Sequence, residues 1–302
     1  MTRFRRQDGQ VTVLTAVFMV GLLGITGFVL DVGSWFRQQR VQQATVDAAA
    51  LAGAQSLPAN PADARAQATS YATKNGGVDG VTITISSKFT PDDMVVVKQA
   101  KSASGYFTKL FGVPTVTVHT HASAISEVPT AAYGAAPIAV DIHHPQLSGP
   151  GCPCFGVPTE IDLGKKGVPG AFGWIDLEDE NGNSGSSTLV DWILHGFQGY
   201  LPLDNYDSDP GAHTGVDAAL QQRWDTDLLF PVYDALDGTG SNAPYHIIGW
   251  TSFHLTWSSA HGNTAVLKGY FDRVIWDGIV SSSGLSNPAI PDLGVHSVAL
   301  VD

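Results

Sequence analysis

Two histidines are spaced so that they could share a metal ion. His119 and His121 lie two residues apart in the alternating run TVTVHTHASAIS, and on a strand both imidazoles would point to one face. A metal site needs a third ligand from elsewhere in the fold, and a solvated strand face is the commoner explanation. The pair therefore indicates a strand with one polar face and does not establish a metal site.

A denser group of histidines and cysteines lies further along the chain. Its members are His143, His144, Cys152 and Cys154. Their spacing matches no standard zinc finger, and the Pro and Gly residues around them favour an irregular loop. The two cysteines flank Pro153, and two alternatives stay open for them: a short disulfide in an oxidising compartment, or two thiols in a loop.

The acidic stretch GWIDLEDENGNSGSS carries the hard oxygen ligands that calcium prefers. They are Asp176, Glu178, Asp179, Glu180, Asn181 and Asn183. The EF-hand pattern fails, because Gly182 at its sixth position would put Leu177 at the first. A hairpin turn at Asn181-Gly182 is a simpler account, and calcium binding stays the alternative.

Nothing in the order of the chemically active residues nominates an active site. The sequence contains no G-x-S-x-G, H-E-x-x-H, P-loop or dinucleotide-binding motif, and its Ser, His and Asp residues suggest no triad. Asp225 and Asp227 could act as acid and base, although exposed acid at a helix end explains them equally well. We therefore expect no catalytic residue, no cofactor and no metal ion, and a protein that is not an enzyme.

The distribution of charge divides the 302 residues into two parts. Residues 1–133 hold 11 Lys and Arg against 8 Asp and Glu, whereas residues 134–302 hold 5 against 20 and include six of the seven tryptophans. This shift predicts a domain boundary after Tyr133. A net charge of −12 argues against a nucleic-acid partner, because phosphate binding needs concentrated Lys and Arg.

Residues 11–30, VTVLTAVFMVGLLGITGFVL, contain no charged side chain and predict a transmembrane helix. Twenty residues at about 1.5 Å each span roughly 30 Å, the thickness of the hydrocarbon layer. Three arginines precede the span and Asp31 follows it, so residues 1–10 are expected in the cytoplasm and the rest outside. A cleaved signal peptide is the alternative, but no small-x-small cleavage site follows the span promptly, and the candidate Ala50-Leu51-Ala52 lies about 20 residues too far along.

The helix is expected to continue beyond the membrane. No proline occurs between Val11 and Leu57, so we predict one helix of about 45 residues, which Pro58 and Pro61 end. Its second half is rich in alanine and would be marginal alone in water, so it must pack against another element.

The anchor and the helix after it resemble the N-terminal region of TadE/TadG-like proteins of the Flp (tight-adherence) pilus system. The residues that carry this resemblance are Gly9 before the apolar helix, Asp31-Val32-Gly33 after it, and the run QATVDAAALAGA from Gln43 to Ala54. The resemblance covers about 45 residues. It implies a membrane-anchored, pilin-like component of pilus assembly whose C-terminal part lies outside the membrane.

The same resemblance suggests a processing junction and an interface. The candidate junction is Gly9–Gln10, although the chain departs from the pilin pattern: position five after the junction is Leu14, and no acid occurs from Gln10 to Leu30. We expect the helix-packing interface to comprise Asp31, Gly33, Ala44, Asp47, Ala48, Leu51 and Ala52.

The remaining patterns predict an α+β fold. Residues 31–133 should form the exported helix and a small pilin-like α+β module, with a helix from Pro61 whose packed stripe is Ala64, Ala68, Tyr71 and Ala72. Strands at 81–86, 94–100 and 115–126 should follow, with a short helix ending at Gly112. The same order, with a YFxxxFG run, resembles the region after the anchor in the TadE/TadG-like proteins.

Residues 134–302 should form an acidic, tryptophan-rich domain, mainly an antiparallel sheet with short helices. One helix is expected to start with Ser187 or Thr188 as its cap, and another with Thr214. Four β-branched and aromatic runs follow, and their large aromatic side chains should be shared between the two faces of the sheet.

The leading hypothesis is a non-enzymatic, single-pass membrane protein of Flp pilus assembly, whose partners are the lipid bilayer and pilins or other assembly subunits. A membrane-tethered binding module unrelated to pili is the first alternative. A tethered metal-dependent hydrolase is the second.

Overall fold

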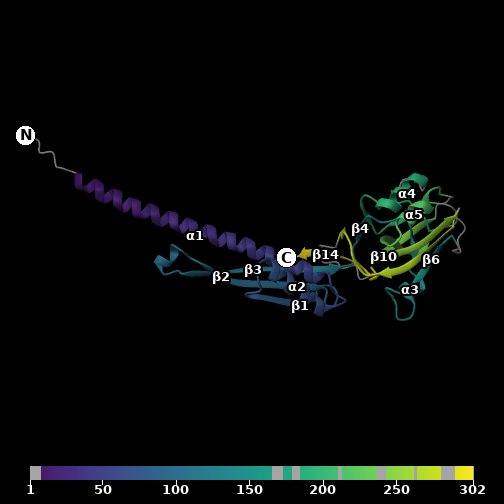
Figure 1. The fold of residues 1–302 in the computed structure, drawn as a ribbon, viewed down its shortest axis with the longest axis horizontal. Helices are drawn as coiled ribbons and strands as arrows, with labels where there is room; N and C mark the ends of the chain where they lie inside the picture. The colour runs from purple at the N-terminus through teal and green to yellow at the C-terminus, as the bar shows by residue number, and fades with distance from the viewer. Residues whose placement is uncertain are drawn as a thin grey trace, which may run out of the picture. The chain divides into compact units, whose positions relative to one another are not determined.

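The computed structural model describes residues 8–164, 173–178, 184–209, 213–236, 243–261, 264–279 and 290–301 (Figure 1). The chain divides into two compact units. Unit 1 comprises residues 1–125 with 300–302, and unit 2 comprises residues 126–299. The boundary expected from composition, at residue 134, lies within unit 2.

Unit 1 is built on one long helix, α1 (Asp8–Ala54), of 47 residues. The expectation of a single uninterrupted helix is confirmed. It ends at Ala54, four residues before Pro58. Proline has no backbone N–H to donate, so the helix cannot continue through Pro58. By its length and composition α1 is long and apolar enough to cross a membrane, and only 6% of its most apolar 18-residue window is buried in the structure.

The second half of α1 packs against α2 (Pro61–Asn75) and a sheet. α2 begins where the side chain of Asn60 accepts a hydrogen bond from the amide of Asp63, with Pro61 as its first residue. Ala64, Ala68 and Ala72 are buried as expected. Tyr71 is 41% exposed, contrary to the expected stripe, because a contact lined by alanines holds the helices too close for a phenol ring.

The sheet of unit 1 has the antiparallel order β1-β2-β3. Its elements are β1 (Val81–Ser86), β2 (Met94–Ser104) and β3 (Thr115–Glu127), and the 3₁₀ helix η1 (Thr108–Phe111) lies between β2 and β3. Val97 pairs with Ile83 on one side and Ala122 on the other. The expected order of two helices, two strands, a short helix and a strand is confirmed.

Unit 2 is mainly antiparallel sheet with short helices, as expected. Its strands are β4 (Ala131–Tyr133), β5 (Val140–Asp141), β6 (Thr159–Leu163), β7 (Tyr200–Pro202), β8 (Asn205–Asp207), β9 (Thr226–Leu236), β10 (Pro244–His261), β11 (Thr264–Asp272), β12 (Val274–Ile275), β13 (Gly278–Ile279) and β14 (Val295–Val301). The largest sheet has the order β5-β9-β10-β11-β6, with β8 also on β10; a smaller one has the order β13-β4-β7. Among these pairs only β5–β9 is parallel, and β12 pairs with β14 in parallel outside them.

The core of unit 2 is aromatic. The rings of Phe230 and Phe271, on β9 and β11, lie 5.9 Å and 5.2 Å from the ring of Phe253 on the strand between them. Trp250 is also fully buried, whereas Trp257 is 41% exposed. The large aromatic residues are therefore shared between the two faces, as predicted, and burying them supplies much of the hydrophobic stabilisation.

Three helices complete unit 2 within the residues described: α3 (Pro145–Ser148), α4 (Gly185–His195) and α5 (Val216–Gln222). Both expected caps are wrong. α4 starts after Ser184, so Ser187 and Thr188 lie inside it. α5 starts after Gly215, which enters the helix at φ +89°, a conformation that glycine adopts freely and Thr214 would not.

Candidate functional site

The metal-binding candidates do not assemble into a site. His119 and His121 lie on one face of β3, as predicted, and both are exposed to solvent. Within the described residues no three His, Cys, Asp or Glu side chains gather in a way that could hold a metal ion.

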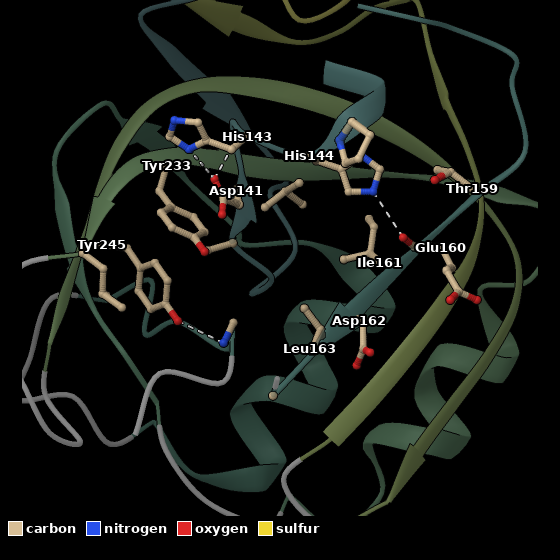
Figure 2. Close-up of a pocket in the computed structure, with 16 residues that line it drawn as sticks. Asp141, His143, His144, Thr159, Glu160, Ile161, Asp162, Leu163, Tyr233 and Tyr245 are labelled. Atoms are coloured by element: carbon tan, nitrogen blue, oxygen red, sulfur yellow. Dashed lines mark hydrogen bonds and ion pairs between the residues drawn. The ribbon is translucent and has the colours of Figure 1, made fainter. Parts of the chain in front are cut away.

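Cys152 and Cys154 form a disulfide with each other. Of the two alternatives, a short disulfide or two thiols in a loop, the structure shows the disulfide. Neither sulfur is therefore available as a thiolate ligand. The neighbouring histidines have other partners: Nδ1 of His143 lies 3.0 Å from Oδ1 of Asp141, and Nε2 of His144 lies 3.2 Å from the carbonyl oxygen of Glu160 (Figure 2). The expected cluster is thus divided among separate contacts.

The acidic residues also separate. Asp176 is buried and accepts a hydrogen bond from the amide of Glu178, and residues 179–183 of the proposed calcium loop lie outside the described residues. Asp227 lies 2.7 Å from Nδ1 of His254, whereas Asp225 adopts φ +58° and its amide donates to the carbonyl of Leu255. The two aspartates therefore serve different local contacts.

Unit 2 contains a cavity of about 310 Å³ beside these histidines (Figure 2). Its walls come from β5, β6, β9 and β10. They are lined by Ala139, Val140, Asp141, His143, His144, Pro145, Thr159, Glu160, Ile161, Asp162, Leu163, Gly164, Gly173, Tyr233, Leu236 and Tyr245. Gly164 and Leu236, which line the cavity, are each the last residue of a described range, so we assign the cavity no ligand.

Two tyrosines line this cavity next to a carboxylate. Burial raises the pKa of Tyr233, and the negative charge of Asp141 raises it further. Burial also raises the pKa of Tyr245, whose hydroxyl oxygen accepts a hydrogen bond from the amide of Gly173. Both phenols stay protonated at neutral pH and act as hydrogen-bonding groups, not as nucleophiles.

The structure divides the interface expected on α1. Asp31 and Ala52 are buried inside unit 1; Asp47, Ala48 and Leu51 are half-buried; Gly33 and Ala44 are exposed. Gly9 and Gln10, the candidate processing junction, lie in the first turn of α1. Part of the small-residue surface is therefore used within this chain, and part of it is open.

The buried part lets α2 approach α1 closely. Ala49, Ala50 and Ala54 are fully buried in the half of α1 that packs against α2 and the sheet. A Cβ on Gly53 would lie 2.9 Å from the carbonyl oxygen of Ala64 and 3.1 Å from Cβ of Ala68. The alanine-rich composition is thus explained first by packing inside unit 1.

The open part forms one continuous face of α1 beyond residue 30. It comprises Gly33, Arg37, Val41, Ala44, Ala48 and Leu51. At about 100° per residue these positions fall within a sector of roughly 80°. A Cβ placed on Gly33 would have no atom within 4 Å, and Val41 is 52% exposed. This open face is suited to a second helix, because small residues permit close approach.

Asp31 lies at the centre of the best-defined polar site in unit 1. Its carboxylate accepts hydrogen bonds from the amides of Tyr106, Phe107 and Thr108 at 2.9, 2.8 and 2.6 Å, and from the hydroxyl of Thr108 at 2.9 Å. These donors belong to residues 105–113, which connect β2 to β3 and which we call the β2–β3 tip. The aspartate that follows the apolar span therefore fixes this tip to α1.

Two opposing effects act on the pKa of Asp31. Burial alone would raise it, but the hydrogen bonds from Thr108, Tyr106 and Phe107 together outweigh burial and hold the pKa below its ordinary value of 3.8. The carboxylate is thus charged at neutral pH, and the chain itself supplies these four hydrogen bonds.

Sequence patterns did not reveal a second contact between the β2–β3 tip and α1, the packing of Phe107 on Gly27. A Cβ on Gly27 would lie 2.6 Å from Cγ of Phe107, so the ring of Phe107 lies directly on the glycine. Gly27 and Phe107 are far apart in the sequence, and no local periodicity links them.

Residues 9–56 match the model of the TadE/G-like Flp pilus-assembly family. This range includes the apolar span, Asp31, the alanine-rich run and the start of the turn after α1. No curated protein and no solved structure matches the chain. The resemblance seen in the sequence is therefore confirmed for the N-terminal region.

Proposed function

We propose that the protein is a membrane-anchored, non-enzymatic component of Flp pilus assembly. Residues 11–30 of α1 span the membrane, residues 1–10 lie in the cytoplasm, and both the rest of unit 1 and all of unit 2 lie outside it. The match of residues 9–56 to the pilus-assembly family carries this proposal, and the exposed apolar surface of α1 supports it.

The open face of α1 binds pilins or other assembly subunits. Three features support this role: the face begins immediately beyond the span, it carries small residues at Gly33, Ala44 and Ala48, and its part from Gly33 to Ala44 is exposed to solvent. A pilus subunit that shares the membrane could pack its own apolar helix along it.

Site-specific photocrosslinking in cells that assemble Flp pili tests this function. With p-benzoylphenylalanine at Ala44, we expect adducts with a pilin or another assembly subunit. The matched control is the same group at Ala66, an exposed alanine on α2, which should give few adducts or none. Adducts only with proteins unrelated to pili, or equal adducts from both positions, would contradict the proposal and favour a tethered binding module.

A further inference from the structure

The β2–β3 tip exposes more large apolar side chains than a soluble loop of nine residues normally carries. Tyr106 is 73% exposed, Leu110 81%, Phe111 74%, Phe107 42% and Val113 43%. The only charged residue among residues 105–113 is Lys109. The tip is also held in a defined shape, because the amide of Gly105 donates to the carbonyl of Pro114 and the amide of Val113 to that of Thr108.

The tip extends along α1 toward the apolar span (Figure 1). Gln38 donates to the carbonyl of Ser102, and Trp35, one turn earlier, donates to the carbonyl of Ser104. The next contacts toward the N-terminus are those of Asp31 with Tyr106 and of Gly27 with Phe107. The strands thus run beside the helix, and their connection reaches the last turn of the span.

The position of these contacts sets the depth of the tip. Gly27 lies three residues inside the expected end of the span at Leu30, which corresponds to about 5 Å along the helix. If residues 11–30 cross the bilayer, the ring of Phe107 lies at the level of the acyl-chain carbons next to the lipid headgroups. Leu110 and Phe111 follow Phe107 within four residues, in the helix η1, so we expect them near the membrane surface.

We propose that the β2–β3 tip is a second membrane contact, inserted into the interfacial region of the leaflet from which unit 1 emerges. This inference rests on the membrane anchoring proposed above. Aromatic side chains such as Tyr106 are favoured at this level, where a ring meets lipid chains and a hydroxyl meets water. Lys109 can extend its ammonium group to lipid phosphates while its methylenes stay in the apolar layer.

The role of Asp31 follows from this arrangement. A carboxylate at the end of a membrane span is costly when its hydrogen bonds are not satisfied. The tip supplies three amides and one hydroxyl to it. The tip thereby shields the charge of Asp31 and places its own apolar side chains in lipid. The protein is then attached to the membrane at two places, α1 and the β2–β3 tip.

Depth-dependent fluorescence quenching tests this contact on the full chain in phosphatidylethanolamine–phosphatidylglycerol vesicles. Single cysteines labelled with an environment-sensitive dye replace Leu110, Val20 or Lys88, and the Cys152–Cys154 disulfide keeps the native sulfurs unreactive without reductant. Val20 lies in the middle of the span. Lys88 is exposed in the connection at the opposite end of β2.

We expect lipids with a doxyl group near the headgroup to quench the dye at Leu110→Cys strongly, and lipids with a deeper doxyl group to quench Val20→Cys. The dye at Lys88→Cys should be quenched only by iodide in the water. Quenching at Val20→Cys without quenching at Leu110→Cys by either lipid would overturn the second contact but leave the anchor intact. A dye at Leu110→Cys that iodide also fails to reach would overturn the second contact too, because the tip would then be covered by protein, either a second copy or another part of this chain. No lipid quenching at Val20→Cys would overturn the anchor itself.

Discussion

Replacing Asp31 by alanine will release the β2–β3 tip from α1. The amides of Tyr106, Phe107 and Thr108 lose their shared acceptor, and we expect their hydrogen exchange to accelerate roughly 10- to 100-fold. Hydrogen exchange of the full chain in detergent micelles, resolved at these residues, measures the effect. Asp31→Asn should give a smaller increase, because an amide offers one acceptor oxygen to three backbone donors.

Asp47→Ala is the matched control for this prediction. Asp47 lies on the same helix and is half-buried, but it accepts its hydrogen bond from the side chain of Gln43, four residues earlier. The exchange of the three tip amides should be unchanged in this variant. If Asp31→Ala also leaves their exchange unchanged, the carboxylate does not hold the tip.

The pKa of Asp31 gives this contact a defined pH dependence. Because the pKa in the folded protein lies below the ordinary value of 3.8, the carboxylate stabilises the folded state at every pH above that value. The stabilisation is lost as the pH falls below 3.8 and the group becomes protonated. The protection of the three tip amides, corrected for intrinsic exchange, should therefore fall as the pH drops below 3.8. In the Asp31→Ala variant their protection should not depend on pH in this range.

Replacing Gly53 by leucine will destabilise unit 1. The new Cβ would lie 2.9 Å from the carbonyl oxygen of Ala64 and 3.2 Å from Cγ2 of Val95, so α2 and the sheet must move away from α1. Overpacking of this kind lowers the free energy of unfolding by about 1–3 kcal/mol. We expect a loss toward the upper end, because the new Cβ meets a backbone oxygen, which cannot turn aside as a flexible side chain can. Urea unfolding of the full chain in micelles, followed by a probe in unit 1, should show a lower midpoint.

Gly33→Leu is the control, because nothing lies within 4 Å of the position that its Cβ would take. Leucine is a better helix former than glycine by about 0.8 kcal/mol, so this change should leave stability unchanged or raise it slightly. Equal midpoints for the two variants would show that α2 does not pack on α1 as described.

The main elements of unit 1 follow from local sequence. The absence of proline from Val11 to Leu57 was sufficient to predict one long helix, and strict alternation was sufficient to predict β1 and β3. The interface on α1 was predicted less well. Small residues favour close packing on either side of a helix, and the sequence does not say that Ala52 is buried while Ala44 stays exposed.

The contacts of Asp31 and Gly27 were not predictable from local patterns. Each depends on the β2–β3 tip, which is brought back to α1 by the whole length of two strands. The caps of α4 and α5 failed for a different reason. Serines and a threonine lie on both sides of the first residue of α4, so the sequence does not single out its cap. At α5 a glycine with positive φ, which leaves no mark in the side-chain pattern, decides where the helix begins.

We propose above that α1 anchors the protein in the membrane, with the chain beyond residue 30 outside. Protease treatment of intact spheroplasts, with an epitope added after Asp302 and the membranes then washed in alkaline carbonate, tests it most directly. We predict that the protein resists extraction by carbonate, and that protease added outside removes the epitope without lysis. A protein that carbonate releases, or an epitope that only lysis exposes to protease, would contradict the account.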